Sequence, residues 1–264
     1  MADYAKLLFE IRDHVAHVTF NRPEAANAMD AEMAREFEDC IAACDDEKKV
    51  RAILLTGAGK MFCAGGDLKA FAAESREALP AFVERMASCL HRGIARMARM
   101  AAPVVAAVNG AAGGAGMSIA CAADFVFAAD SAKFTMAYTR AGLTPDGSSS
   151  YFLPRIVGFR RAAELMIANP VLDAARALEL GIATRVVPAN ELIPQAEKFA
   201  VDLAAGATLA YGTVKRLLLS SANNTLESQM ELEGASIARM MTTADAREGI
   251  AAFVAKRPPK FTAE

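Results

Sequence analysis

A single carboxylate, Asp146, stands in a loop whose other residues are small, proline or apolar: the segment AGLTPDGSSS at positions 141–150. Earlier in the chain, the glycine-rich turn NGAAGGAG at positions 109–116 opens an apolar helical pattern. Enolate chemistry needs one group that moves a proton and backbone amides, such as those at a helix N-terminus, that hold the developing oxyanion. Asp146 and the glycine turn together predict that chemistry.

Each feature also has a plainer interpretation when it is taken alone. A Pro-Asp-Gly sequence is a common turn, and Asp146 would suit the N-cap of a helix over 148–153. The glycine turn does not match a nucleotide site, since Ile119 replaces the third glycine of a dinucleotide fingerprint and no lysine is near for a phosphate loop. A second small-residue loop, AGGD at 64–67, favours the chemical interpretation, because two such loops can each offer a backbone N–H to one carbonyl oxygen.

The segments that must position these loops alternate strands with helices. Strands are predicted at 7–12, 15–20, 50–56, 104–108, 125–128 and 184–187, the first two as a hairpin. Asp30 caps a first helix, and further helices are predicted at 79–100, 114–122, 160–168 and 174–180. After residue 190 every segment has a helical pattern: 191–205, 207–221, 225–242 and 244–255. We therefore expect a core over 1–190 that carries the site formed by these loops and a helical oligomerisation region over 191–264.

Composition limits the possible partners. The 264 residues are 54% hydrophobic and 23% charged, which is apolar for a monomer, so we expect an oligomer that hides apolar helices. The net charge of −2 gives no electrostatic reason to bind nucleic acid or an anionic membrane. Neither a signal peptide nor an apolar run of about 18 residues is recognisable, so we expect a cytoplasmic protein.

The cysteines and histidines do not predict a metal site. Five scattered cysteines, an odd number, are expected to be buried reduced thiols rather than a disulfide framework: Cys40, Cys44, Cys63, Cys89 and Cys121. Cys40 and Cys44 would share a helix face, but a zinc site needs two further well-spaced ligands. The three histidines do not supply them.

Four stretches of the chain resemble the crotonase superfamily, the enoyl-CoA hydratases and isomerases. They lie at 21–29, 62–68, 106–124 and 134–155, in the family's order and at its spacing. The resemblance implies an α/β fold, a spiral of repeated ββα units with a C-terminal helical trimerisation region. It also implies acyl-CoA thioester substrates, a homotrimer or dimer of trimers, and no cofactor beyond the coenzyme A that the substrate carries.

The resemblance also assigns roles to individual positions. The backbone N–H groups of Ala64 and Ala115 match the family's oxyanion hole, with Gly114 as the alternative second donor because glycine is usual at the Ala115 position. Positions that match coenzyme A and substrate contacts are Ala25, Ala26, Ala28, Ala64, Gly65, Gly66, Asp67, Leu68, Gly114 and Tyr138. Asp67 also suits the cap of the helix after its loop.

One departure from the family pattern distinguishes among its reactions. Family hydratases carry two glutamates where this chain has Ser118 and Tyr138, whereas Asp146 stands where family isomerases carry Asp or Glu. The resemblance therefore implies an isomerase that moves a double bond from 3-enoyl-CoA to 2-enoyl-CoA, with Asp146 as acid and base. The alternatives are hydration through another acid, hydrolysis, the ring isomerisation of phenylacetate breakdown, or a non-catalytic acyl-CoA-binding protein. Whether Tyr138 and Arg140 line the acyl pocket or its rim stays open at this point.

Overall fold

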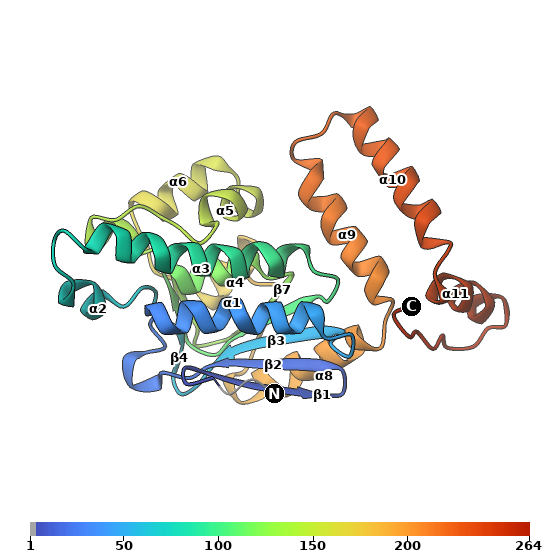
Figure 1. Cartoon of the computed structure of the whole chain (residues 1–264), viewed down its shortest axis with the longest axis horizontal. Helices are drawn as coiled ribbons and strands as arrows, with labels where there is room; N and C mark the ends of the chain where they lie inside the picture. The colour runs from blue at the N-terminus through green and yellow to red at the C-terminus, as the bar shows by residue number, and fades with distance from the viewer. Residues whose placement is uncertain (1–3) are drawn as a thin grey trace.

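A six-stranded sheet lies at the centre of the computed structural model, which describes residues 4–264 (Figure 1). Its strands, in spatial order, are β1 (Leu7–Arg12), β2 (Val15–Phe20), β3 (Ala52–Gly57), β5 (Val104–Val108), β7 (Phe125–Ala129) and β10 (Arg185–Val187). β1 and β2 pair antiparallel as the predicted hairpin, and all later neighbours pair in parallel. The inner strands are covered on both faces, which explains why β3 and β5 are nearly continuous apolar runs.

A second sheet consists of four very short strands in the order β4 (Met61–Cys63), β6 (Ala111–Gly113), β8 (Lys133–Thr135) and β9 (Leu172–Asp173). Along the chain β4 follows β3, β6 follows β5, and β8 follows β7, and a helix comes after each pair. Successive strand–strand–helix units therefore wind as a spiral, which confirms the predicted fold class. Strands of two or three residues are too short for an alternating pattern to reveal, so the sequence does not predict this sheet.

Two long helices, α1 (Ala31–Asp46) and α3 (Leu79–Arg99), pack side by side against the body of the fold (Figure 1). Asp30 caps α1 as predicted, accepting the Met33 N–H at 2.8 Å. Gly93 allows the close packing, because a Cβ there would lie 2.8 Å from the Phe37 ring. The buried stripe of α3 consists of Met86, Leu90, Ile94 and Met97.

Shorter helices complete the core: α2 (Leu68–Ala73), α4 (Ala115–Ala122), α5 (Ser149–Val157), α6 (Phe159–Ile167) and α7 (Ala174–Glu179). Every residue of α4 is buried, so its one polar side chain, Ser118, must find its hydrogen bonds inside the protein. All five cysteines are free thiols, and all but Cys89 are buried, as expected.

Four helices end the chain, close to their predicted bounds: α8 (Leu192–Ala204), α9 (Thr208–Ser221), α10 (Leu226–Met240) and α11 (Ala244–Val254). α8 packs against β3, β5 and β7, whereas α9 to α11 extend away from the sheets (Figure 1). Large apolar side chains on these three helices are exposed, among them Leu218 at 68% and Phe253 at 85%. Large apolar side chains that are exposed in this way indicate a surface that contacts another protein chain.

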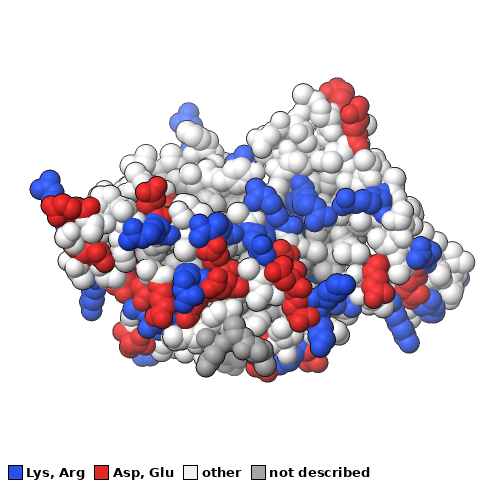
Figure 2. Space-filling view, viewed as in Figure 1, with Lys and Arg blue, Asp and Glu red and all other residues white. Residues whose placement is uncertain are grey.

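The surface carries charges of both signs. Figure 2 shows acidic and basic side chains interspersed over the face to which α1 and α3 belong, in keeping with the net charge of −2. Over residues 4–264, no helix has both the length and the apolar character that crossing a membrane requires.

Candidate active site

The two glycine loops that follow β4 and β6 lie in contact with each other. A Cβ on Gly65 would lie 3.1 Å from the Gly113 carbonyl oxygen, and a Cβ on Gly116 would lie 2.2 Å from the Cys63 carbonyl oxygen. Gly65 also has a φ of +109°, a region that favours glycine. The two loops therefore lie against each other, and the glycines are needed because the backbones approach so closely.

Two backbone amides at this junction are the candidate oxyanion donors. α4 begins at Ala115, whose N–H has no partner within the helix because it belongs to the first turn. The Gly114 N–H donates to the Thr135 carbonyl at 3.0 Å, so the available second amide is that of Ala115 rather than Gly114. The Ala64 N–H donates to the Ala26 carbonyl at 3.1 Å. A thioester oxygen must therefore share the Ala64 amide with the Ala26 carbonyl or displace that carbonyl.

Asp146 is a positioned carboxylate rather than a solvated turn residue. The Tyr138 hydroxyl donates to its Oδ1 at 2.6 Å, and the hydroxyls of Tyr138 and Ser118 lie 3.1 Å apart. On the other side, His91 Nε2 lies 3.7 Å from Asp146 Oδ2 and accepts the Gly147 N–H at 3.1 Å. One carboxylate oxygen is therefore held by a phenol, and the other lies beside an imidazole.

Tyr138 can act toward Asp146 only as a hydrogen-bond donor. Burial, reinforced by the negative charge of Asp146, raises the pKa of the Tyr138 phenol well above its ordinary value, so the hydroxyl keeps its proton. The Ser118 hydroxyl is fully buried and also lies 3.1 Å from the Gly114 carbonyl oxygen. At the two positions where family hydratases carry glutamates, this chain thus has two hydroxyl groups that bond to each other.

A cavity of about 240 Å³ joins the amides to the acid. Eight of the predicted site residues line it: Ala64, Gly65, Gly66, Leu68, Gly114, Ala115, Tyr138 and Asp146. Apolar side chains from α2 and α3 form much of the remaining wall, including Phe71, Met86 and Leu90. Within residues 4–264, Asp146 is the only carboxylate in the lining. The cavity therefore combines one acid with backbone amides in an otherwise apolar setting.

Four of the predicted binding residues are not in the lining: Ala25, Ala26, Ala28 and Asp67. The alanines belong to the loop that begins with the short 3-10 helix η1 (Pro23–Ala25). This loop is tied to the site by the Ala26 carbonyl and by the Met29 N–H, which donates to the Gly65 carbonyl at 2.7 Å. These alanines are therefore neighbours of the cavity rather than part of its wall.

Asp67 caps α2, the second of the two roles expected for it. Its side chain accepts the N–H groups of Lys69 and Ala70 and pairs with Arg22 at 3.0 Å. Burial opposes ionisation, but the hydrogen bonds from Ala70 and Arg22 outweigh it and lower the pKa of Asp67.

The structure places His91 beside Asp146, and it gives Tyr138 and Arg140 different roles. The sequence predicts the helix of His91 but not the face that meets Asp146, because that contact joins segments far apart in the chain. Tyr138 lines the cavity, whereas the Arg140 side chain donates to the Asn169 carbonyl and ties the loop to its surroundings.

Comparisons with known proteins give one consistent family. The family model described as Enoyl-CoA hydratase/isomerase matches residues 10–264. The 1,2-epoxyphenylacetyl-CoA isomerase of Escherichia coli (strain K12) is 38% identical over 259 residues, which cover 97% of this chain and 98% of that protein. The trans-2-decenoyl-[acyl-carrier-protein] isomerase of Streptococcus mutans is 31% identical and covers 98% of this chain and 99% of its own length.

Comparison with solved structures gives the same family. The crystal structure of an enoyl-CoA hydratase from Polaromonas sp. JS666 superposes with a TM-score of 0.89 at 34% identity, covering 96% of this chain and 98% of that one. A putative enoyl-CoA hydratase from Streptomyces coelicolor A3(2) superposes with a TM-score of 0.92 at 32% identity, covering 100% of this chain and 96% of that one.

Proposed function

The chain belongs to the enoyl-CoA hydratase/isomerase family of the crotonase superfamily, and we propose that it is an isomerase that converts 3-enoyl-CoA to 2-enoyl-CoA. One observation carries the proposal: among the described residues, Asp146 is the only carboxylate in the cavity that also contains the oxyanion amides. Hydration by the family's means needs two carboxylates. An isomerase needs one group that takes a proton from one carbon and returns it to another.

The proposed mechanism uses only groups of this cavity. The thioester oxygen binds between the amides of Ala115 and Ala64, and the N-terminus of α4 favours the negative charge that develops there. Asp146 takes the proton from the α-carbon, the electrons pass into a dienolate, and protonation at the γ-carbon by Asp146 leaves the double bond at position 2. The protein gains and then loses one proton, so no cofactor is needed besides the coenzyme A of the substrate.

Tyr138 is proposed as a positioning residue for this proton transfer. Its hydrogen bond at 2.6 Å fixes Asp146 Oδ1 and leaves Oδ2 for the substrate proton. We expect Tyr138→Phe to lower kcat about tenfold with little change in KM. A tenfold loss of rate corresponds to about the free energy that one hydrogen bond to a charged group contributes. Tyr211→Phe, on α9 and outside this cavity, is the control. An unchanged kcat in Tyr138→Phe would show that the phenol does not position the acid.

Hydration tests the choice between isomerase and hydratase. Because Ser118 and Tyr138 replace the paired glutamates, we expect only traces of water addition to crotonyl-CoA. The measurement is the loss of absorbance of the conjugated thioester in highly purified protein. A rate typical of hydratases would overturn the isomerase proposal.

Ring isomerisation is the second candidate, and the 38% identity to a 1,2-epoxyphenylacetyl-CoA isomerase favours it specifically. It too begins with removal of a proton next to the thioester carbonyl, so Asp146 would keep its role. A panel of linear 3-enoyl-CoA substrates and aryl-epoxide acetyl-CoA substrates separates the two candidates by their kcat/KM values.

We also propose that the protein is a cytoplasmic homotrimer or dimer of trimers. The apolar side chains that α9 to α11 expose are expected to be buried between subunits. Light scattering at micromolar concentration should give a mass three or six times that of the chain. A mass near the 27.9 kDa of one chain would contradict this.

A further inference from the structure

The peptide unit that follows Asp146 is held at both of its polar atoms. Its carbonyl oxygen accepts the Ser149 N–H at 3.2 Å and the Ser149 hydroxyl at 2.9 Å. Its N–H, which belongs to Gly147, donates to His91 Nε2 at 3.1 Å. Ser149 is the first residue of α5 and His91 lies on α3, so the backbone that carries the candidate acid is fixed between two helices.

The backbone after Asp146 also has a conformation that its contacts must maintain. Gly147 and Ser148 both have a left-handed φ, at +59° and +65°. For a residue with a side chain, such as Ser148, this region costs roughly 1–2 kcal/mol. A Cβ on Gly147 would lie 2.9 Å from the Ser118 Cβ, so the segment lies directly against α4. The hydrogen bond to His91 is therefore one of a small number of contacts that keep the Asp146 loop in place.

This hydrogen bond requires a neutral imidazole. To accept the Gly147 N–H, Nε2 must have a free lone pair, so His91 carries its proton on Nδ1. The same Nε2 lies 3.7 Å from Asp146 Oδ2. A protonated imidazole has two N–H donors and no acceptor, so it cannot bind the Gly147 N–H, whereas it can donate to the carboxylate. The contact of Nε2 with Gly147 and an ion pair of Nε2 with Asp146 therefore exclude each other.

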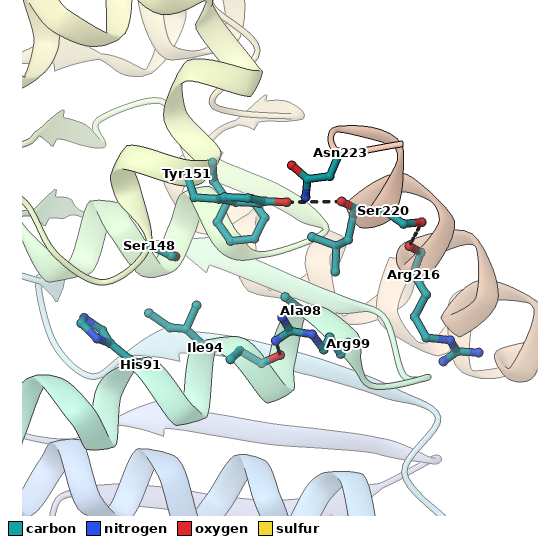
Figure 3. A pocket seen from close by; sticks show the side chains of 12 residues that line it. His91, Ile94, Ala98, Arg99, Ser148, Tyr151, Arg216, Ser220 and Asn223 are labelled. Carbon is teal, nitrogen blue, oxygen red and sulfur yellow. Dashed lines mark hydrogen bonds between the residues drawn. The ribbon is translucent and has the colours of Figure 1, made fainter. Parts of the chain in front are cut away.

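The groups around His91 leave Asp146 as its main electrostatic partner. The His91 side chain is 49% exposed and lies with Ser148 at one end of a cavity of about 690 Å³ between α3, α5 and α9 (Figure 3). The other titratable groups that line this cavity are Tyr151, Arg99 and Arg216, and the two arginines lie toward its other end. In the active-site cavity the titratable groups are Asp146 and Tyr138. The next arginines along α3 are paired with acids of α1: Arg92 with Glu38, and Arg96 with Asp45 and Asp46.

We propose that His91 is a positioning residue for Asp146 that supports proton transfer when it is neutral and blocks it when it is protonated. The neutral ring holds the Gly147 N–H and leaves Oδ2 for the substrate proton. The cationic ring releases the backbone and pairs with Oδ2, and its charge opposes the protonation that Asp146 must undergo as the base. This inference rests on the proposed role of Asp146 in the isomerase reaction.

The pH dependence of kcat/KM in two variants tests the proposal. His91→Phe keeps a ring but has no acceptor, whereas the amide oxygen of His91→Gln reaches about as far as Nε2, accepts an N–H and does not titrate. At about pH 8, where histidines are ordinarily neutral, His91→Phe should lower kcat roughly three- to tenfold with little change in KM, the effect of one lost hydrogen bond. His91→Gln should restore most of that loss.

The acid side of the profile separates a positioning role from a merely structural one. In the unmodified protein, protonation of His91 should lower kcat/KM by about tenfold for each pH unit below the midpoint of its titration. Both His91 variants should lack this decrease. His14→Gln, which removes an exposed histidine from the turn between β1 and β2, is the control and should keep it.

NMR of the protein with isotope-labelled histidine and glycine follows the contact without relying on turnover. The chain has only three histidines, so the spectrum of His91→Gln identifies the His91 signals. We expect an unprotonated Nε2 at about pH 8. We also expect a Gly147 amide signal that shifts with the His91 titration, at the same midpoint as the decrease in kcat/KM.

Identical acid limbs in the unmodified protein and His91→Gln, with isomerisation measurable in both, would overturn the proposal and leave the isomerase function intact. A proton on Nε2 of the neutral ring would overturn it as well. If no 3-enoyl thioester is isomerised but the Gly147 amide follows the His91 titration, the isomerase function fails and the control of the Asp146 loop by His91 stands.

Discussion

Asp146→Asn is expected to lower the isomerisation of 3-enoyl-CoA by at least about 100-fold while thioester binding survives. The amide keeps the size of the side chain, and its oxygen still accepts the Tyr138 hydroxyl that now bonds Oδ1 at 2.6 Å. What disappears is the group that accepts the α-proton. Exchange of that proton with heavy water should fall in parallel, because exchange and isomerisation use the same base. The measurements are kcat, the dissociation constant of a saturated acyl-CoA, and deuterium incorporation by mass spectrometry.

Asp67→Asn is the matched control, since that carboxylate caps α2 and pairs with Arg22. It should reduce stability and leave kcat nearly unchanged. If Asp146→Asn is folded, binds thioesters and turns over at the rate of the unmodified protein, the catalytic acid lies elsewhere.

Lys215→Met is expected to lower the free energy of unfolding by about 3 kcal/mol, because it leaves a largely buried carboxylate without its partner. Lys215 anchors α9 to the core through an ion pair with Asp124 at 2.7 Å and bonds to two carbonyls near the end of α3. The Asp124 side chain is 22% exposed, which places the loss at the lower end of the range for breaking a buried pair. Burial lowers the pKa of Lys215 and raises the pKa of Asp124, so each charge depends on the other. Urea unfolding at a fixed protein concentration measures the loss.

The double variant Lys215→Met with Asp124→Asn should regain part of this stability, because the unpaired charge is gone and the asparagine oxygen can still accept the Val104 N–H. Lys198→Met, which breaks an exposed ion pair with Asp202, should change stability by less than about 0.5 kcal/mol. A Lys215 variant as stable as this control would show that the ion pair does not hold α9 in place.

The sequence was sufficient to predict those parts of the fold that have a long local signature. The hairpin of β1 and β2 and the strand at Val104–Val108 have clear apolar patterns. The C-terminal helices are separated by residues typical of turns, with Gly206 between α8 and α9, and Asn223 and Asn224 between α9 and α10. Local patterns of this kind determine the type of an element and its approximate ends.

The candidate site was predictable to the extent that it is built from loops with distinctive composition. The glycine loops and Asp146 were identified because clustered glycines and a lone acid stand out in an apolar chain. The contact of His91 with Asp146 and the bond from Tyr138 depend on how α3 and the loop after β8 pack, which no local pattern encodes. The second sheet has no sequence signature for a different reason, since its strands are too short to show a period.

In the proposed mechanism a single carboxylate, Asp146, removes the α-proton and delivers it to the γ-carbon. A 3-enoyl-CoA labelled with deuterium at the α-carbon tests this under single-turnover conditions, with the product analysed by mass spectrometry and NMR. We expect part of the deuterium to appear at the γ-carbon of the 2-enoyl product and the transfer to be lost in Asp146→Asn. Deuterium transfer that persists at the unmodified rate in Asp146→Asn, or a hydroxyacyl thioester in place of the 2-enoyl product, would contradict this mechanism.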